Sequence, residues 1–338
     1  MPAIMMPKET PRCIVTAPAR LHLGFLDLHG ELGRTFGSIG VAISGFATTV
    51  AVEPADSISA LGEEAERAAR VARQFFAQRE GVGGAKLTVT EAIPAHVGLG
   101  SGTQLALAVG TALSKLFRWD LKTRTIAQLA GRGNRSGIGI GAFDTGGFLL
   151  DGGRGDRAEP PRILVRMPFP TAWRIVLVFD QIGHDMHGEN EVAAFCALPE
   201  FPAATSAELC RLTLMQALPA LQDEDITGFG RAIGAVQRIV GDYFAPAQGA
   251  RFTSPAVTEV LRWMEAEGVH GVGQSSWGPT GFAVVASDAQ AQELVRGAAA
   301  RWGTAHRLSF SVVSGRNHGG DIQSHAPSNV QRLSTINK

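Results

Sequence analysis

The sequence predicts an α+β protein built from two domains. Its 338 residues suffice for two domains of ordinary size with substantial cores. Segments that alternate like strands and segments with helical periodicity occur together in both halves, which favours α+β over a doubly wound sheet. Pro168 and Pro170 split one apolar run into two strands, and we place the domain boundary there.

These observations give an N-terminal domain over residues 12–168 and a C-terminal domain over residues 169–322. Residues 1–11 contain three prolines, and residues 323–338 are polar without apolar periodicity. Both end segments are therefore expected to be flexible tails.

The N-terminal domain is expected to begin with strands. A short strand at 13–16 leads through a proline break into an alternating segment at 20–28, and two short strands follow around Gly45. The segment 62–81 carries glutamates in its first turn and apolar residues at helical spacing, which predicts an amphipathic helix. The remaining expected elements are a strand at 85–93, a helix ending near 117 and a short helix within 121–135.

The C-terminal domain mixes helices and strands in the same way. Two strands within 162–180 lie on either side of the prolines. Apolar periodicity then predicts four helices, and a glycine-rich loop at 271–280 precedes a strand, a helix and a last strand. These segments are, in order, the helices 188–198, 206–221, 226–244 and 255–268, the strand 281–287, the helix 288–302 and the strand 307–315.

Composition excludes several classes of function. The formal net charge is zero and the pI is near 7.1, so bulk charge gives no reason to expect binding to nucleic acid or to an anionic membrane. Three dispersed cysteines form neither a CxxC pair nor a zinc spacing, which favours reduced thiols. No apolar run is long enough to span a membrane, and the first residues lack the pattern of a signal peptide. We therefore expect a cytoplasmic protein.

The segment AHVGLGSGTQLALAVG, residues 95–110, predicts an anion site. Gly98 and Gly100 permit backbone conformations that other residues avoid, and they let N–H groups approach a ligand. Ser101 is a good N-cap, and Gln104 completes the spacing of a capping box. The helix that follows offers unpaired N–H groups and the positive end of its dipole to an oxyanion. The alternative is a strand-to-helix turn whose glycines serve packing alone.

The hydroxyls of Ser101 and Thr103 can bind phosphate oxygens or a divalent ion. No lysine lies in the loop, and the spacing differs from both the Walker loop and the dinucleotide fingerprint. We take the following residues as the phosphate-binding group: Gly98, Leu99, Gly100, Ser101, Gly102, Thr103 and Gln104.

Other candidates are polar residues among glycines or on alternating strand positions. Arg20 and His22 alternate, so both can face one pocket; the alternative is the exposed edge of a half-buried strand. Arg132 and Arg135 are suited to bidentate oxyanion binding, or belong to a surface loop with Ser136. The remaining candidates here are Arg34, which binds an anion or is solvated, and Asp144, a magnesium ligand, an acid/base group or a turn cap.

The loop at 271–280 supplies a further group. A tryptophan between small polar residues and glycine is unusual if its role is packing alone. It can stack on an aromatic ring or form one side of a sugar-binding pocket. The alternative is a core tryptophan that closes the domain interface. The group comprises Gln274, Ser275, Ser276 and Trp277.

Three segments resemble the GHMP kinase superfamily. PAHVGLGSGTQLAL, residues 94–107, is similar to its phosphate-loop motif P-x-x-x-G-L-G-S. APARLHLGFLDLHG and GVGQSSWGP occur where the superfamily has its N-terminal substrate motif and its C-terminal glycine loop. One branch matches over about residues 14–320: the β-ribofuranosylaminobenzene 5′-phosphate synthases, which PARLHLGFLDL, GRGNRSGIGIGAFDTGGFLLDGG and GQSSWGPT resemble.

The resemblance implies a fold and a reaction. The fold is the GHMP-kinase fold, with a ribosomal-S5-like N-terminal half and a ferredoxin-like C-terminal half. The reaction joins 5-phosphoribosyl 1-diphosphate to 4-aminobenzoate, or to 4-hydroxybenzoate, with loss of CO₂ and diphosphate, in tetrahydromethanopterin biosynthesis. It further implies Mg²⁺, a homodimer, and roles for His187 and Glu189. Arg20, His22, Arg135 and Asp144 are the candidate catalytic residues, and Ser101 and Asp144 the candidate metal ligands.

One position departs from the kinase pattern. GHMP kinases that use a catalytic carboxylate typically read S-G-[IS]-D, whereas here Ser136-Gly137-Ile138 is followed by Gly139. The departure counts against a small-molecule kinase, which is the main rival interpretation, and it is compatible with a synthase that deprotonates no alcohol. A non-catalytic binding protein on the same scaffold is the second rival. Sequence leaves open the choice of arene and which phosphate the loop holds.

Overall fold

Two long antiparallel strands organise the N-terminal half of the computed structural model, which describes residues 11–79, 83–156, 159–181, 198–276, 278–303 and 307–325. β1 (Arg12–Asp27) and β2 (Phe36–Ala55) pair along most of their lengths. The sequence predicted a proline break in the first and two short strands in place of the second. Both strands instead continue, because a register shift beside Pro18 accommodates the residue that cannot donate to the ladder.

Seven strands of the described residues form the N-terminal sheet, in the order β11-β1-β2-β4-β3, with β5 on β2 and β6 on β5. Its last strand corrects an expectation about the tail. β11 (Asp321–His325) pairs antiparallel with the start of β1, so the chain is still in a strand of the N-terminal sheet three residues beyond 322. The other strands are β3 (Ser59–Gly62), β4 (Gly84–Glu91), β5 (Phe148–Asp151) and β6 (Ile163–Met167).

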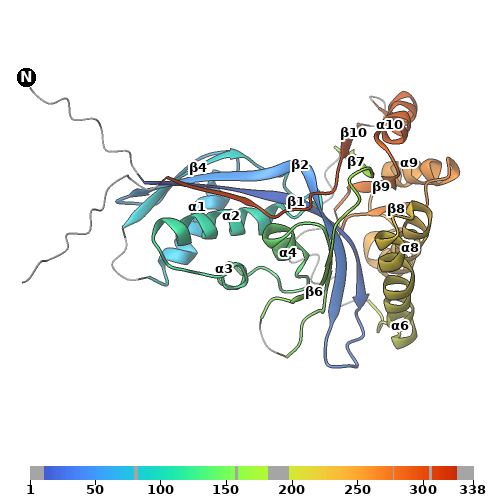
Figure 1. The fold of residues 1–338 in the computed structure, drawn as a ribbon, viewed down its shortest axis with the longest axis horizontal. Coiled ribbons are helices and arrows are strands. Elements are labelled where there is room, and N and C mark those ends of the chain that lie inside the picture. The colour runs from blue at the N-terminus through green and yellow to red at the C-terminus, as the bar shows by residue number, and fades with distance from the viewer. Residues whose placement is uncertain are drawn as a thin grey trace, which may run out of the picture.

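Among the described residues, α1, α2 and α4 pack against one face of this sheet, and α3 packs on α2 and α4 (Figure 1). α1 presents the apolar face that the sequence predicted, and α2 is buried along most of its length. Phe75, Leu105 and Leu113 share a buried cluster with Val15 and Val50 of the strands. The four are α1 (Ala65–Phe76), α2 (Ser101–Leu116), α3 (Thr123–Leu129) and α4 (Ile138–Asp144), of which α4 was not expected from the sequence.

In the described part of the C-terminal half, four strands form a sheet in the order β10-β7-β9-β8. Alternate residues of β7 (Arg174–Asp180) face opposite cores: Val176 and Val178 pack toward α9 and α10, and Ile175 packs with α8. The remaining elements are β8 (Gly271–Gln274), β9 (Gly281–Val285), β10 (Leu308–Val313), α6 (Ala203–Leu212), the π-helix η1 (Thr213–Ala217), α7 (Leu218–Gln222), α8 (Ile226–Gln248), α9 (Pro255–Ala266) and α10 (Asp288–Trp302).

Strands and helices thus occur in both halves, as an α+β protein requires, and β6 and β7 lie on either side of the prolines as predicted. The second half of β1 runs alongside α8 of the C-terminal half and packs against it (Figure 1). Leu21 and Leu23 of β1 belong to the same buried cluster as Phe229 and Val236 of α8. This shared core fixes the two halves against each other next to Arg20 and His22, the polar residues that alternate with these leucines on β1.

Candidate active site

Two glycine-rich segments meet at the junction of the halves. Gly98 and Gly100 have φ values of 87° and 86°, which confirms the left-handed backbone expected of them. A Cβ on Gly278 would lie 2.4 Å from the Gly98 nitrogen, so the two segments approach more closely than a side chain allows. The Thr280 hydroxyl also donates to the Val97 carbonyl at 2.6 Å. The loop at 271–280 therefore fixes the position of the predicted phosphate loop.

The start of α2 differs from the predicted capping box. Gly100 is the N-cap, and Ser101 is the first helical residue with no side-chain cap. Gln104 donates from Nε2 to the Gly139 carbonyl at 2.8 Å, so it links α2 to α4 and does not reach back to the loop. The Leu99 side chain is buried in the core, so Leu99 offers only its backbone. No side chain caps this helix start, and the Thr103 N–H donates to the Gly100 carbonyl at 3.1 Å.

Arg20 lies directly beneath this loop. Its side chain donates from Nη1 to the Gly98 carbonyl at 2.5 Å, and its backbone N–H donates to the Leu99 carbonyl at 3.2 Å. Burial lowers the pKa of the guanidinium to about 10, which still leaves it charged at neutral pH. A half-buried positive charge thus supports the loop from below.

His22 lies two positions further along β1, beside the second glycine-rich segment. Its backbone N–H donates to the Ser275 hydroxyl at 3.1 Å, and that hydroxyl donates to the Gly98 carbonyl at 2.9 Å. The imidazole is 4% exposed and its ring centre lies 4.6 Å from that of Phe25. Burial, aided by the charge of Arg20, lowers the pKa of His22 to about 3, so the ring is neutral at physiological pH.

A neutral His22 predicts a specific pH dependence of stability. The pKa is about 3 in the folded protein against an ordinary 6.5, so its contribution to stability is complete above about pH 6.5 and is lost as pH falls toward 3. His22→Gln should therefore lose thermal stability less steeply than the parent between roughly pH 6.5 and 5. Thermal unfolding across that range measures the difference, and parallel curves would contradict the assignment.

A pocket of about 310 Å³ opens beside Arg20 and His22. Thr103 lines it from the predicted phosphate loop, and Ser276, a non-glycine residue with φ 59°, lines it from the other half. Three arginines line this pocket, and among its described lining residues there is no carboxylate. The lining is Arg20, His22, Phe25, Thr103, Gly131, Arg132, Gly133, Asn134, Arg135, Ser136, Gly139 and Ser276.

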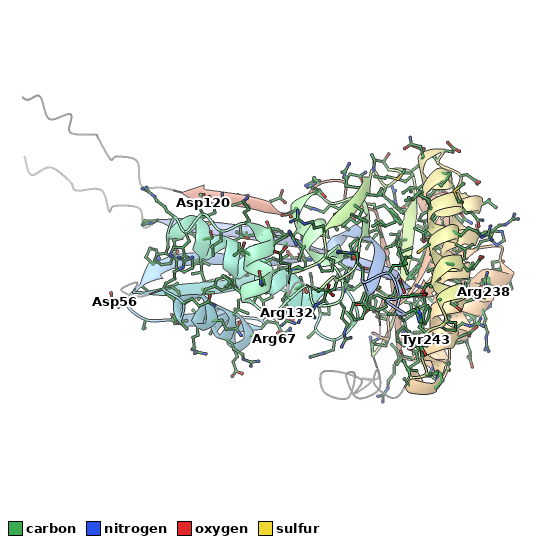
Figure 2. The ribbon with its side chains drawn as sticks, turned by 90° about the horizontal axis from the view of Figure 1, so that it is seen from below. Asp56, Arg67, Asp120, Arg132, Arg238 and Tyr243 are labelled. Carbon is green, nitrogen blue, oxygen red and sulfur yellow. The ribbon has the colours of Figure 1, made fainter. Side chains whose placement is uncertain are left out.

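The side chains of Arg132 and Arg67 both lie beside the first turn of α2, and the sequence did not single out Arg67. A Cβ placed on Gly102 would lie 3.0 Å from Nη2 of Arg67 and 3.2 Å from Nη1 of Arg132 (Figure 2). Burial lowers the pKa of Arg132, and the charge of Arg67 lowers it further. Arg67 also forms an ion pair with Glu64 at 2.7 Å. Two cations held this close at a helix N-terminus favour an anion between them.

A buried carboxylate holds the arginine-bearing turn in place. Asp151 accepts hydrogen bonds from the hydroxyls of Ser38 and Ser136 and from the N–H groups of Gly137 and Gly153. Burial raises its pKa, against the effect of these four donors. Asp151 lies outside the pocket lining, so its role is to position the turn from Gly131 to Ser136.

Two expected site residues lie elsewhere. The guanidinium of Arg34 donates to the carbonyls of Gly152 and Gly153, both at 2.6 Å, so its hydrogen-bond donors are already engaged by the backbone. Arg34 also lines a separate apolar groove. Asp144 ends α4, whereas the arginine-lined pocket is at the beginning of that helix. It lines another surface pocket beside Thr123, and burial raises its pKa. Asp144 therefore lies outside the arginine-lined pocket, and its pairing with Ser101 on a metal stays a prediction.

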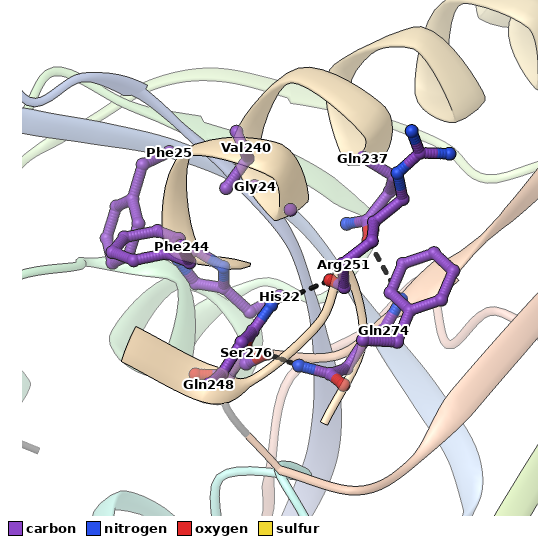
Figure 3. A pocket seen from close by; sticks show the side chains of 12 residues that line it. His22, Gly24, Phe25, Gln237, Val240, Phe244, Gln248, Arg251, Gln274 and Ser276 are labelled. Atoms are coloured by element: carbon purple, nitrogen blue, oxygen red, sulfur yellow. Dashed lines mark hydrogen bonds between the residues drawn. The ribbon is translucent and has the colours of Figure 1, made fainter. Parts of the chain in front are cut away.

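Some predictions cannot be placed, because His187, Glu189 and Trp277 lie outside the described residues. Gln274 is described: its side chain accepts from the Thr253 N–H at 2.6 Å and donates to the Ser276 carbonyl at 2.9 Å. It lines a second, smaller cleft (Figure 3). Within the described ranges, no three His, Cys, Asp or Glu side chains cluster as a metal site, and no helix is long and apolar enough to cross a membrane.

Comparison with known proteins places this site in a family. The GHMP kinases N terminal domain matches residues 65–152, and the GHMP kinases C terminal domain matches residues 217–304. A β-ribofuranosylphenol 5′-phosphate synthase of Archaeoglobus fulgidus is 34% identical over 80% of this chain and 87% of its own. The chain belongs to the β-ribofuranosylphenol 5′-phosphate synthase family. The Methanothermobacter thermautotrophicus member is 30% identical over 80% of this chain and 88% of its own.

Solved structures confirm the GHMP-kinase fold. Homoserine kinase from Cytophaga hutchinsonii superimposes with a TM-score of 0.69 at 19% identity, over 95% of this chain and all of that one. Lactococcus lactis galactokinase gives 0.68 at 15% identity, over 92% of this chain and 95% of that one. As a member of the synthase family, the protein keeps this kinase architecture around a pocket lined by arginines.

Proposed function

We propose that this protein joins 5-phosphoribosyl 1-diphosphate to 4-hydroxybenzoate or 4-aminobenzoate, with release of CO₂ and diphosphate, in tetrahydromethanopterin biosynthesis. The product named for the relatives is a phenol, which supports the hydroxy acid as substrate. The observation that carries the proposal is the pocket itself: three arginines and a helix N-terminus without a carboxylate among the described lining residues. A substrate with two phosphoryl groups at one end and a phosphate at the other matches that charge.

Gly139 explains why the pocket favours this reaction over phosphorylation of an alcohol. A Cβ at this position would lie 2.9 Å from Cγ2 of Thr103, and the Gly139 carbonyl accepts the hydrogen bond of Gln104. The helix α4 therefore packs too closely on α2 for the carboxylate that the kinase motif supplies there. No described carboxylate lines the pocket in its place.

In the proposed reaction, the residues of the pocket position the two substrates and stabilise the negative charge of the leaving group. The ring carbon that bears the carboxylate forms a bond to C1 of the ribose as the bond from C1 to diphosphate oxygen breaks. The bond from that carbon to its carboxylate then breaks, and its electron pair restores the aromatic ring as CO₂ leaves. Arg20, Arg132 and Arg135 stabilise the departing diphosphate, and no enzyme nucleophile is required.

The described lining does not fit a protein-held Mg²⁺, which prefers carboxylate oxygens, and we assign no step to the metal. Mg²⁺ remains in the proposal only as a counter-ion carried by the diphosphate. A homodimer also remains part of the proposal. Its support is an apolar groove with Leu32, Leu164 and Leu214 in its lining, which are 89%, 66% and 63% exposed.

Release of labelled CO₂ tests the proposed function. Pure protein is incubated with phosphoribosyl diphosphate, Mg²⁺ and carboxyl-labelled 4-hydroxybenzoate or 4-aminobenzoate. We expect labelled CO₂ from at least one arene, in proportion to the diphosphate formed. Absence of labelled CO₂ from both would exclude the synthase reaction.

The kinase alternative rests on fold and on weaker relatives, among them a 4-diphosphocytidyl-2-C-methyl-D-erythritol kinase from Geobacillus at 25% identity. It predicts consumption of ATP with a small alcohol, whereas the synthase predicts none. The same preparation, tested with ATP and a panel of alcohols, separates the two.

A further inference from the structure

The second cleft lies between β1, α8 and the end of β8, and it adjoins the arginine-lined pocket (Figure 3). His22, Phe25 and Ser276 line both cavities and form their common wall. Phe25 and Phe244 lie together on one side of the cleft. A substrate that spans this wall would have one end among arginines and the other in a mainly apolar recess.

Two residues that line the cleft each carry a polar side-chain atom with no hydrogen-bond partner among the described residues. These atoms are Nε2 of His22 and Oε1 of Gln248, and both are buried. The orientation of the Gln248 amide is fixed, because its Nε2 donates to the Arg251 carbonyl at 2.7 Å. The oxygen is therefore left as an acceptor. Unpartnered buried polar atoms are costly, so their presence here indicates a ligand group that completes them.

The size of the cleft limits that group. Its volume is about 30 Å³, which accommodates one or two groups the size of a water molecule and excludes a six-membered ring. The recess therefore fits a substituent of a ring, while the ring itself lies at the wall shared with the larger pocket. The carboxylate-bearing carbon of the arene must face the ribose, so the opposite, para substituent points away from it.

We propose that this cleft binds the electron-donating para substituent of the aryl carboxylate, hydroxyl or amino, with Oε1 of Gln248 accepting its hydrogen. The proposal rests on the proposed function. As the ring attacks, positive charge spreads onto that substituent and makes it a stronger donor, so the bond to Gln248 strengthens in the transition state. The neutral His22 completes the pair: its Nε2 donates to a hydroxyl oxygen in one tautomer and accepts from an amino group in the other.

Paired ligands test the proposal without turnover. 4-Hydroxybenzoate and 4-methylbenzoate have substituents of similar size, but only the first can donate a hydrogen bond. The full-length protein should bind the hydroxy acid roughly tenfold more tightly, as expected for one buried acceptor left unpaired by the methyl group. Titration of each arene, with phosphoribosyl diphosphate omitted, measures this preference. Equal affinity of the parent protein for both would overturn the proposal.

Two variants separate the acceptor from the bond that braces the turn after α8. Gln248→Leu removes both the acceptor oxygen and the donor to Arg251, whereas Gln248→Glu removes only the donor. The preference should fall about tenfold in Gln248→Leu and persist in Gln248→Glu. Equal losses in the two variants would assign Gln248 to the fold alone. Gln222→Leu, an exposed substitution outside both cavities, serves as control.

The outcomes distinguish this proposal from the proposed function. A preference that depends on Gln248 in a protein that releases no labelled CO₂ would retain the cleft as an arene site and remove the synthase reaction. Release of CO₂ with a preference that does not depend on Gln248 would remove the cleft proposal alone.

Discussion

Arg132→Met is expected to lower kcat/KM for phosphoribosyl diphosphate by about 10²- to 10³-fold, the usual effect of losing one preorganised donor to developing negative charge. Arg132 is partly buried and lines the pocket. Its side chain lies beside the first turn of α2, as does that of Arg67. Methionine keeps much of the side-chain volume and removes the charge. Steady-state kinetics with the arene saturating measures the loss, while the KM of the arene should change little.

Comparison variants sharpen this result. Arg135→Ala should also weaken phosphoribosyl diphosphate more than the arene. Arg262→Met, on the exposed surface of α9, should leave both unchanged. If Arg132→Met weakened the two substrates equally, the oxyanion role of Arg132 would be wrong. A double variant with Arg67→Met should be less than additive if one anion contacts both cations.

Gly139→Asp is expected to destabilise the protein by about 1–3 kcal/mol, the usual cost of overpacking, and to abolish CO₂ release without creating a kinase. The added Cβ would lie 2.9 Å from Cγ2 of Thr103 and would push α4 away from α2. The Gly139 carbonyl would then lose the hydrogen bond from Gln104. Chemical denaturation measures the stability change, and coupled assays for diphosphate and ADP measure the two activities.

Thr103→Ser provides a matched test, because it removes the methyl group that the new Cβ would meet and keeps the hydroxyl in the pocket. The double variant Gly139→Asp with Thr103→Ser should recover part of the stability, giving a coupling energy of about 0.5–3 kcal/mol. No recovery would show that the close packing of Gly139 against Thr103 is not the cause. Alcohol phosphorylation by Gly139→Asp would refute our account of why the pocket is not a kinase site.

Much of the site was accessible from sequence because it carries unusual residues. Glycines with positive φ, arginines among glycines, and a polar pair alternating on one strand all lie where such patterns predict: at the loop, the adjoining turn and the pocket wall. Residues whose role depends on a distant neighbour gave no such signal. Arg67 has the appearance of a solvated arginine on an amphipathic helix, and Asp151 that of an acid at a strand end.

The predictions that the structure does not place as expected have the same origin. Arg34 and Asp144 are the right residue types for an anion or a metal site, but the fold gives Arg34 two backbone carbonyls and places Asp144 at the far end of α4. The capping box failed because Gln104 has a stronger partner in the Gly139 carbonyl, 35 residues away, than in its own helix turn. Each error concerns which partner a polar group finds.

Local patterns in the sequence determined the α+β class, the glycine loop, the arginine-rich turn and, through resemblance, the synthase reaction. Such features depend on backbone conformation and residue type over a few neighbouring positions, so they can be read along the chain. Only the tertiary structure decided that Gly278 meets Gly98, that Gly139 has no room for a side chain, and that His22 separates a charged pocket from a narrow cleft. These depend on packing between segments distant in sequence, where a few tenths of an ångström determine what fits.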